Sequence, residues 1–230
     1  TIFTKNGMVK RTNINEFKIQ RYSKPITSIN LKDDDLVVSI CISNDPYVFI
    51  TTKNGYGITY NICEVPITGL KTAGVKAILL KNDYVISGML YNEDMEYLTI
   101  ITNKKTAKRI KLLDFEMGKR ARKGVQIIRD VKTSPYYIFN SFIVNYKEIL
   151  GIKTSNEIIN IKLTELPIQD RYATGSNICK NDILDVFIIS NMIEKKEEIK
   201  KIEKENISLE TIDNKIMTID DFLNNVEKGN

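Results

Sequence analysis

Most hydrophobic residues in the first 190 positions fall in short runs that are rich in β-branched and aromatic side chains. Residues 36–42, 47–52 and 185–190 are examples, and such runs are typical of β-strands. Polar residues separate the runs, and the segments Thr4 to Gly7 and Thr52 to Gly55 both read TKNG. Because Asn and Gly tolerate the positive φ of tight turns, these segments predict hairpins. The pattern therefore predicts a mostly β protein.

The same pattern returns about every fifty residues, a period that is typical of propeller-like arrays. A glutamate followed by an apolar residue marks each of four copies: Glu16, Glu64, Glu116 and Glu165. A glycine follows in three copies: Gly74, Gly124 and Gly175. It stands ten residues after the glutamate in the second and fourth copies but eight after it in the third. We expect about four blades, near residues 1–43, 44–93, 94–144 and 145–190.

The last forty residues differ in kind from the repeats. Residues 191–230 carry 7 Lys against 10 Asp or Glu, and Ile193, Ile199 and Ile202 have a spacing that resembles a helix. Thr218 and Asp221 resemble a capping box. We expect an acidic tail that is partly helical or disordered and that packs a few apolar residues on the last blade. An alternative is that this acidic element competes with a polyanion for the basic part of the chain.

The positive charge lies in the repeats. Residues 1–190 hold 27 Lys or Arg against 19 Asp or Glu, although the whole chain has a net charge of only +5. Basic residues recur at the turns and connections of successive copies, so a radial array would place them on one rim. Such a stripe suits a polyanion bound through its phosphates, whereas an isolated cluster is more often a solvated surface.

We predict the following DNA-binding residues, of which Lys76, Lys119, Arg120, Arg122 and Lys123 are the strongest candidates: Lys5, Lys10, Arg11, Lys53, Lys71, Lys76, Lys104, Lys105, Lys108, Arg109, Lys119, Arg120, Arg122, Lys123 and Arg171. Loop cations neutralise phosphates without reading bases, and no recognition helix is evident, so binding should be largely independent of DNA sequence. Few exposed aromatic residues are interleaved with the basic clusters. This favours bending of a duplex over stacking on single strands.

The chain contains no histidine, which excludes Ser-His and Cys-His nucleophile pairs and removes the commonest metal ligand. Asp33, Asp34 and Asp35 form an acidic run that could hold a divalent cation, but its place before a strand favours a turn. The segment Gly55 to Gly57 is too short for a dinucleotide loop and is interpreted as a hairpin. We therefore expect no active site, metal or cofactor in this stretch of chain.

Two features of the sequence indicate the cellular compartment in which the protein works. The three cysteines, Cys41, Cys63 and Cys179, are odd in number and far apart, so we interpret them as buried small hydrophobes in a reducing cytosol. No apolar stretch approaches the roughly 20 residues that cross a bilayer, and no leader pattern opens the chain. We expect a cytoplasmic protein with no membrane partner.

The segment Glu64 to Ile78 (EVPITGLKTAGVKAI), the TKNG turns and Lys32 to Val38 (KDDDLVV) resemble the C-terminal domain of bacterial type IIA topoisomerase A subunits. Met117 to Val125 (MGKRARKGV) is similar to a recurrent loop of that family. The resemblance covers about residues 1–190. It implies a β-pinwheel, a propeller-like array of four-stranded blades in which neighbours exchange a strand and a basic rim bends duplex DNA. Because Thr1 falls inside a repeat, we expect further blades N-terminal to it.

Within the family, the segment from Pro66 to Lys76 (PITGLKTAGVK) is closer in style to topoisomerase IV A subunits of Gram-positive bacteria than to DNA gyrase. A gyrase-type QRRGGKG box is absent, and Gly118 to Gly124 (GKRARKG) is the nearest approach to it. The family's catalytic tyrosine follows an arginine. The dipeptides Arg21-Tyr22 and Arg171-Tyr172 match this only superficially, so the resemblance implies that the nucleophile lies in another part of the whole protein.

The resemblance implies a non-catalytic module that holds duplex DNA and presents a segment for strand passage in decatenation and relaxation. It also implies partners, namely the remaining domains of the A subunit, together with an ATPase B subunit in a heterotetramer, with ATP and Mg²⁺ bound elsewhere. The setting would be the nucleoid of a bacterial cytoplasm, during chromosome segregation. Alternatives are the DNA-wrapping domain of gyrase and a protein-binding propeller. The absence of Trp weighs against WD-type arrays.

Overall fold

The computed structural model describes residues 1–18, 25–32, 34–145 and 147–189. Thr1–Ile189 forms one compact unit, and its described residues form strands, turns and four short 3₁₀ helices. The all-β fold expected from the sequence is confirmed. The tail of residues 191–230, the Arg21-Tyr22 dipeptide and Asp33 lie outside the described residues. Among those that are described, no helix has the length and apolar character needed to cross a bilayer.

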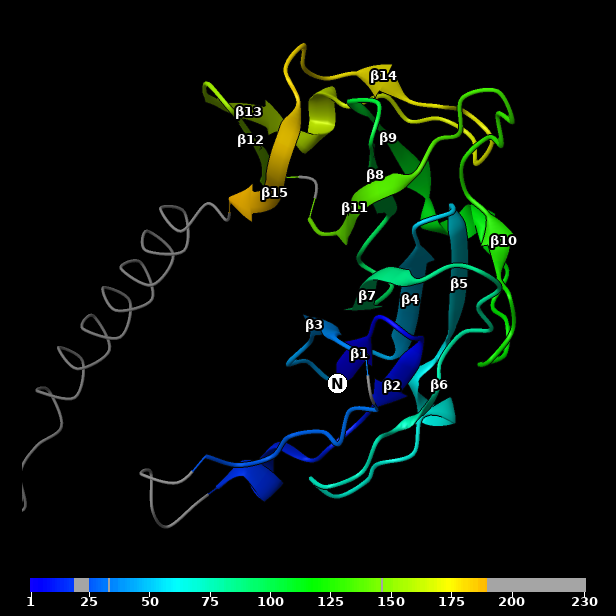
Figure 1. Ribbon diagram of the computed structural model, residues 1–230, viewed down its shortest axis with the longest axis vertical. Coiled ribbons are helices and arrows are strands. Elements are labelled where there is room, and N and C mark those ends of the chain that lie inside the picture. The colour runs from blue at the N-terminus through cyan, green and yellow to red at the C-terminus, as the bar shows by residue number, and fades with distance from the viewer. Residues whose placement is uncertain (19–24, 33, 146, 190–230) are drawn as a thin grey trace, which may run out of the picture. The chain divides into compact units, whose positions relative to one another are not determined.

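Four antiparallel sheets, which we call blades, follow one another through the described chain (Figure 1). In strand order, the first contains β3 (Val37–Ile40), β1 (Ile2–Thr4), β2 (Met8–Lys10) and β6 (Val75–Lys76). The second contains β10 (Val125–Gln126), β5 (Tyr56–Asn61), β4 (Tyr47–Thr52) and β7 (Val85–Tyr91). The third contains β11 (Ile138–Ile143), β8 (Tyr97–Thr102), β9 (Thr106–Lys111) and β14 (Ser176–Asn177). The fourth contains β13 (Ile158–Lys162), β12 (Ile149–Thr154) and β15 (Ile183–Ile189).

Each of the first three blades is completed by a short strand from the next copy of the repeat. β10, for example, follows β9 in the chain but pairs with β5 of the blade before, with Val125 opposite Gly57 and Gln126 opposite Tyr56. β6 and β14 pair in the same way with β2 and β9. In Figure 1 these three strands lie on the outer side of their blades, away from β3, β7 and β11. This strand exchange is the β-pinwheel arrangement that the resemblance implied.

A 3₁₀ helix follows the hairpin of each copy: η1 (Ile14–Phe17), η2 (Ile62–Glu64), η3 (Leu112–Asp114) and η4 (Leu163–Glu165). The positions of these helices show that the alignment predicted for the third copy of the repeat was wrong. Glu64 and Glu165 end their helices, but the residue that ends η3 is Asp114, not Glu116. Gly124 therefore stands ten residues after the equivalent acidic residue, as in the second and fourth copies.

The hairpin turns have the conformation that the TKNG segments predict. Gly7 and Gly55 have φ of 79° and 80°, and Lys105 has φ of 60° in the degraded third copy. The residue after each exchanged strand donates its amide to the carbonyl oxygen of the positive-φ residue in the preceding blade's turn, as Ile127 does to Gly55 at 2.8 Å. The hairpin turns therefore also fix the far end of each exchanged strand.

The glycines that precede the exchanged strands have a clear steric role. Gly74, Gly124 and Gly175 have φ of 80°, 81° and 84°, a region that L side chains avoid. A Cβ at Gly124 would also lie 2.4 Å from the carbonyl oxygen of Gly57. The exchanged strand can therefore approach the preceding blade only through a residue without a side chain.

Neighbouring blades pack face to face, so their strands are buried on both faces. In β4, Val48 and Ile50 belong to the core shared with the first blade, whereas Phe49 belongs to the core shared with the third. A third core, which includes Ile101 and Leu150, joins the third and fourth blades. This explains why the central strands are near-continuous hydrophobic runs rather than alternating ones.

Two local expectations have different outcomes. Asp34 lies in a turn with φ of 63°, and Asp35 accepts the amide hydrogens of Asn6 and Leu36, which confirms an acidic turn there. All three cysteines are free, but none is fully buried as expected: Cys63 is exposed, and Cys41 and Cys179 are half-buried. In η2, Ile62 is buried, whereas the next residue, Cys63, faces solvent.

We expect Gly124→Ala to lower the free energy of unfolding by at least about 1–2 kcal/mol, because alanine is strained at positive φ and its Cβ meets the backbone of β5. Gly69→Ala is the matched control, since a Cβ there meets nothing within 4 Å. It should change the free energy of unfolding by less than about 1 kcal/mol. Urea unfolding followed by circular dichroism measures both, and equal losses would contradict the steric argument.

Candidate nucleic-acid interface

The loops that lead into the exchanged strands form the outer edge of the blades. We call residues 66–74, 116–124 and 167–175 the perimeter loops. Each runs along the outer strand of the preceding blade, as when the amide of Gly118 donates to the carbonyl oxygen of Thr59 at 2.9 Å. The perimeter loops carry six of the residues that the sequence predicts to bind DNA, and Lys76 follows one of them in β6.

The middle perimeter loop is held by Arg120. Its amide donates to Oε2 of Glu64 at 2.7 Å, and its Nε donates to the carbonyl oxygen of Glu64 at 3.1 Å. Its Nη1 donates to the carbonyl oxygen of Lys76. The next residue, Ala121, has φ of 62° and donates its amide to Ala77 at 2.9 Å. Arg120 therefore ties the third copy's loop to the second copy.

The neighbours of Arg120 point their charges outward. Lys119, Arg122 and Lys123 are exposed, as are Lys71 and Lys76 of the preceding copy. Within the described residues, the one ion pair joins Lys105 to Asp182, so these five cations have no carboxylate at ion-pair distance. Their charges are therefore available to bind an anion. The Lys123 ammonium also lies 4.3 Å from the ring centroid of Tyr56.

Arg171 is the predicted site residue of the last perimeter loop, and it is half-buried. Its guanidinium lies 5.8 Å from the ring centroid of Tyr172 and 6.0 Å from that of Phe115. Arg171 therefore packs against two aromatic side chains. This loop has fewer exposed cations than the middle perimeter loop.

Lys10 and Lys108 occupy the same register position in β2 and β9, and the structure buries both at 1% exposure. The ammonium of Lys108 donates to the carbonyl oxygens of Asp170, Arg171 and Ala173 at 2.9, 2.8 and 2.7 Å. Lys10 donates to the carbonyl oxygen of Leu70 at 2.7 Å and to that of Ser28. The sequence analysis placed these two lysines on the DNA-binding rim. The structure instead uses them to hold perimeter loops from the inside.

Arg109 has a similar internal position, at 8% exposure. It donates from Nε to the carbonyl oxygen of Leu166 at 3.0 Å and from Nη2 to that of Thr164 at 3.2 Å. Its guanidinium covers the ring of Tyr97 at 4.9 Å. Arg11 is the equivalent residue of the first blade and is half-buried. Neither the buried lysines nor Arg109 presents its charge at the surface.

The remaining predicted residues lie on the hairpin turns, at one end of the strands, and several contact tyrosines. Lys5 and Lys53 lie 4.8 and 5.2 Å from the ring centroid of Tyr84. Lys53 also lies 4.8 Å from Tyr137. These tyrosines are half-buried, so the expectation of few exposed aromatics among the basic clusters stands, but the contacts themselves were not predicted. These tyrosines precede the inner strands β7 and β11 by one residue, and their distance along the chain from the lysines hid the pairing.

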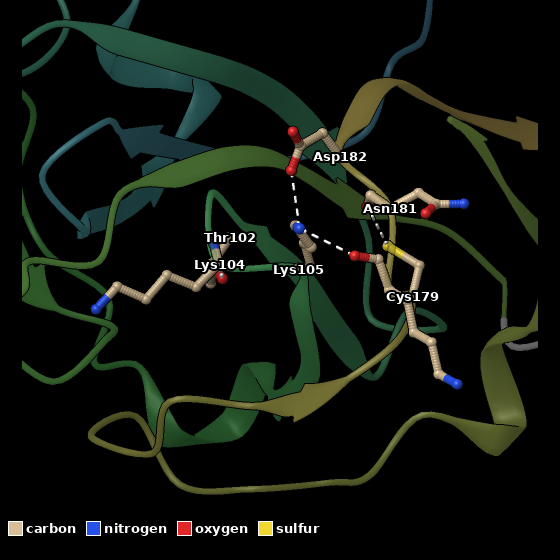
Figure 2. Close-up of polar contacts among 7 residues, drawn as sticks. Thr102, Lys104, Lys105, Cys179, Asn181 and Asp182 are labelled. Carbon is tan, nitrogen blue, oxygen red and sulfur yellow. Dashed lines mark hydrogen bonds and ion pairs between the residues drawn. The ribbon is translucent and has the colours of Figure 1, made fainter. Parts of the chain in front are cut away.

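The third hairpin turn sends its two lysines in different directions (Figure 2). Lys105 points to Asp182, at 2.8 Å, and donates to the carbonyl oxygen of Lys180 at 3.0 Å. This pairing lowers the pKa of the Asp182 carboxyl. Lys104 points away and donates to Oγ of Ser134 at 2.6 Å. Both lysines are therefore partly committed to internal contacts.

The geometry thus divides the predicted residues into exposed perimeter cations, buried cations and turn cations.

The family model of the DNA gyrase C-terminal domain, a β-propeller, matches residues 2–42, 46–92 and 96–136. The chain belongs to this family. The matched segments correspond to the first three copies of the repeat, and the family recognised from the sequence is confirmed.

Relatives of this chain include the A subunit of DNA topoisomerase 4 from Bacillus subtilis (strain 168). It is 35% identical over 177 residues, which are 76% of this chain and 22% of that protein. The same protein from Staphylococcus epidermidis is 32% identical over 184 residues, which cover 78% of this chain and 23% of that protein. This chain therefore spans less than a quarter of the length of these relatives.

Solved structures show the same family fold. The C-terminal domain of DNA topoisomerase IV superposes with a TM-score of 0.81 at 34% identity, covering 89% of this chain and 65% of that one. The DNA gyrase A C-terminal domain superposes with a TM-score of 0.70 at 18% identity, covering 82% of this chain and 64% of that one. The second likeness concerns the fold alone.

Burial lowers the pKa of Lys108 from 10.5 to about 8, and nearby Asp170 partly opposes this. Between these two pH values the unfolded chain binds a proton that the folded protein releases. The contribution of Lys108 to the free energy of unfolding is therefore lowest below pH 8 and rises toward pH 10.5. We expect the difference in unfolding free energy between wild type and Lys108→Met to grow in favour of wild type across this window, by at most about 1.4 kcal/mol per pH unit.

Denaturant unfolding at a series of pH values measures this difference. Lys111→Met is the matched control, because Lys111 is exposed at the end of the same strand. It controls for the loss of one lysine from this strand. A profile for Lys108→Met that rises no more steeply than that of the control would contradict the assignment.

Proposed function

We propose that the perimeter of this β-pinwheel binds duplex DNA through its phosphates. One observation carries the proposal: Lys119, Arg122 and Lys123 are exposed on a loop whose backbone is anchored by Arg120. Lys71 and Lys76 extend the positive surface along the preceding copy. Loop cations on a rigid edge suit a phosphate backbone that runs from blade to blade. Binding should be largely independent of base sequence.

The similarity to topoisomerase IV A subunits supports a wider proposal for the whole protein. This module would hold and bend duplex DNA beside a catalytic core that performs ATP-dependent strand passage in decatenation and relaxation. The remaining domains of the A subunit, together with an ATPase B subunit, would complete a heterotetramer. ATP, Mg²⁺ and the catalytic tyrosine would belong to those parts. The enzyme would act on the nucleoid in the bacterial cytoplasm during chromosome segregation.

We expect the combined change Lys119→Ala, Arg122→Ala and Lys123→Ala to weaken duplex binding about tenfold or more at moderate salt. It should also reduce the slope of log affinity against log salt by up to about 3, since each lost phosphate contact contributes about 0.9. A fluorescent duplex titrated across a salt series measures both quantities. Arg120 stays in place because it anchors the loop.

A second triple variant, Lys32→Ala, Lys132→Ala and Lys147→Ala, removes the same charge from exposed positions outside the perimeter loops. It should keep most of the affinity and the slope. Equal losses in the two variants would mean that net charge, not the perimeter, drives binding. No duplex binding by the wild-type protein at low salt would refute the proposal itself.

A further inference from the structure

A groove of about 660 Å³ opens between the second and third blades. It is lined by the start of β4, the connection from β7 to β8, and η3 with the residues after it. These segments lie at the strand ends opposite to the hairpin turns. The groove is therefore on a different surface from the lysine–tyrosine contacts described above.

The lining of the groove is apolar and aromatic. Tyr91, Leu112 and Phe115 form a buried floor, and the ring of Tyr47 lies 5.3 Å from that of Tyr91. Leu113 also lines the groove, and this residue is 95% exposed. A leucine so exposed contributes almost nothing to packing within its own blade. It is available to an apolar group from another molecule.

The other copies show that this leucine is not required by the blade. Leu113 is the second residue of its 3₁₀ helix, and the second residue of the helix in the first, second and fourth copies is Asn15, Cys63 or Thr164. Those three residues are exposed and smaller or polar. Leu113 is therefore a feature of this groove rather than of the repeat.

The groove is also acidic. Glu93 and Glu96 line it, with Lys111 as the one cation among its lining residues, and Asp94 and Glu116 are exposed in the same segments. Tyr47 donates its hydroxyl hydrogen to Glu93 at 3.0 Å. This excess of carboxylates among the exposed lining and flanking residues disfavours phosphates and favours cations. The groove borders the start of the middle perimeter loop, but its charge is opposite in sign to that of Lys119, Arg122 and Lys123 farther along that loop.

We propose that this groove is a docking site for a basic polypeptide segment of a partner protein, which inserts an apolar side chain beside Leu113 and places lysines or arginines against Glu93 and Glu96. Apolar anchors in a concave site supply most of the affinity in such contacts, and the surrounding charges select the partner. The volume of the groove suits one or two large side chains rather than a folded domain. The proposal is independent of DNA binding at the perimeter.

The methionines provide a local readout. Met95 and Met117 line the groove, whereas Met8 lies in β2 of the first blade. The whole protein, labelled with ¹³C at its methionine methyl groups, would be titrated with a short synthetic peptide in which lysines flank a leucine and a phenylalanine. We expect saturable shifts of the Met95 and Met117 methyl signals and none of the Met8 signal. The same peptide with glutamates in place of lysines should cause none.

Two variants test the anchor and the charges. Leu113→Asp and the pair Glu93→Lys with Glu96→Lys should each weaken peptide binding about tenfold or more. The matched control is Cys63→Asp, at the equivalent exposed position of the second copy, and it should bind the peptide like wild type. The triple perimeter variant should also bind it normally.

Several results would overturn the proposal. One is peptide binding that is unchanged by Leu113→Asp, and another is an equal response to the glutamate peptide. Shifts confined to the tail signals of Met192 and Met217 would place the peptide outside the groove. Shifts of Met95 on addition of a duplex or a single-stranded oligonucleotide instead would assign the groove to nucleic acid.

Discussion

Strand exchange between successive blades is the interaction on which the rest of the structure depends. β6, β10 and β14 complete the blade before their own, and each is preceded by a positive-φ glycine that lies against that blade's backbone. Because the exchanged strand is fixed at both ends, the loop in front of it is fixed as well. The perimeter cations therefore project from a rigid edge rather than from free surface loops.

The same constraint explains why two kinds of cation are found near the perimeter. A buried ammonium group is tolerated only where acceptors surround it. Lys10 and Lys108 find those acceptors in the carbonyl oxygens of the next copy's loop. The first and last perimeter loops thus owe their shape partly to cations beneath them, whereas Lys119, Arg122 and Lys123 give the middle loop its outward charge.

Much of the fold could be predicted from the sequence, because its signals are local and repeated. The TKNG turns, the β-branched runs and the period near fifty residues all describe features that recur within one copy. The register of the third copy was wrong by two residues. Asp114 and Glu116 are both acidic and both precede a large apolar residue, and only the place of η3 in the chain separates them.

The candidate site was less predictable, because burial depends on residues far apart in the chain. Lys108 lies about sixty residues from the carbonyl oxygens that it binds, and nothing in its own neighbourhood separates it from an exposed lysine such as Lys111. The stacking of Lys53 on Tyr84 and Tyr137 has the same origin. Charge and recurrence indicated the kind of surface, but only the pairing of strands showed which cations reach it.

The backward direction of the exchange also sets an order in which the blades can be finished as the polypeptide leaves the ribosome. β5 ends at Asn61, but its outer partner β10 begins only at Val125. At elongation rates of about 5–20 residues per second, roughly sixty residues take several seconds to add. During that interval the second blade has an unpaired edge, which is the kind of surface that pairs with other nascent chains. Each of the first three copies thus depends on its successor for protection as well as for its fourth strand.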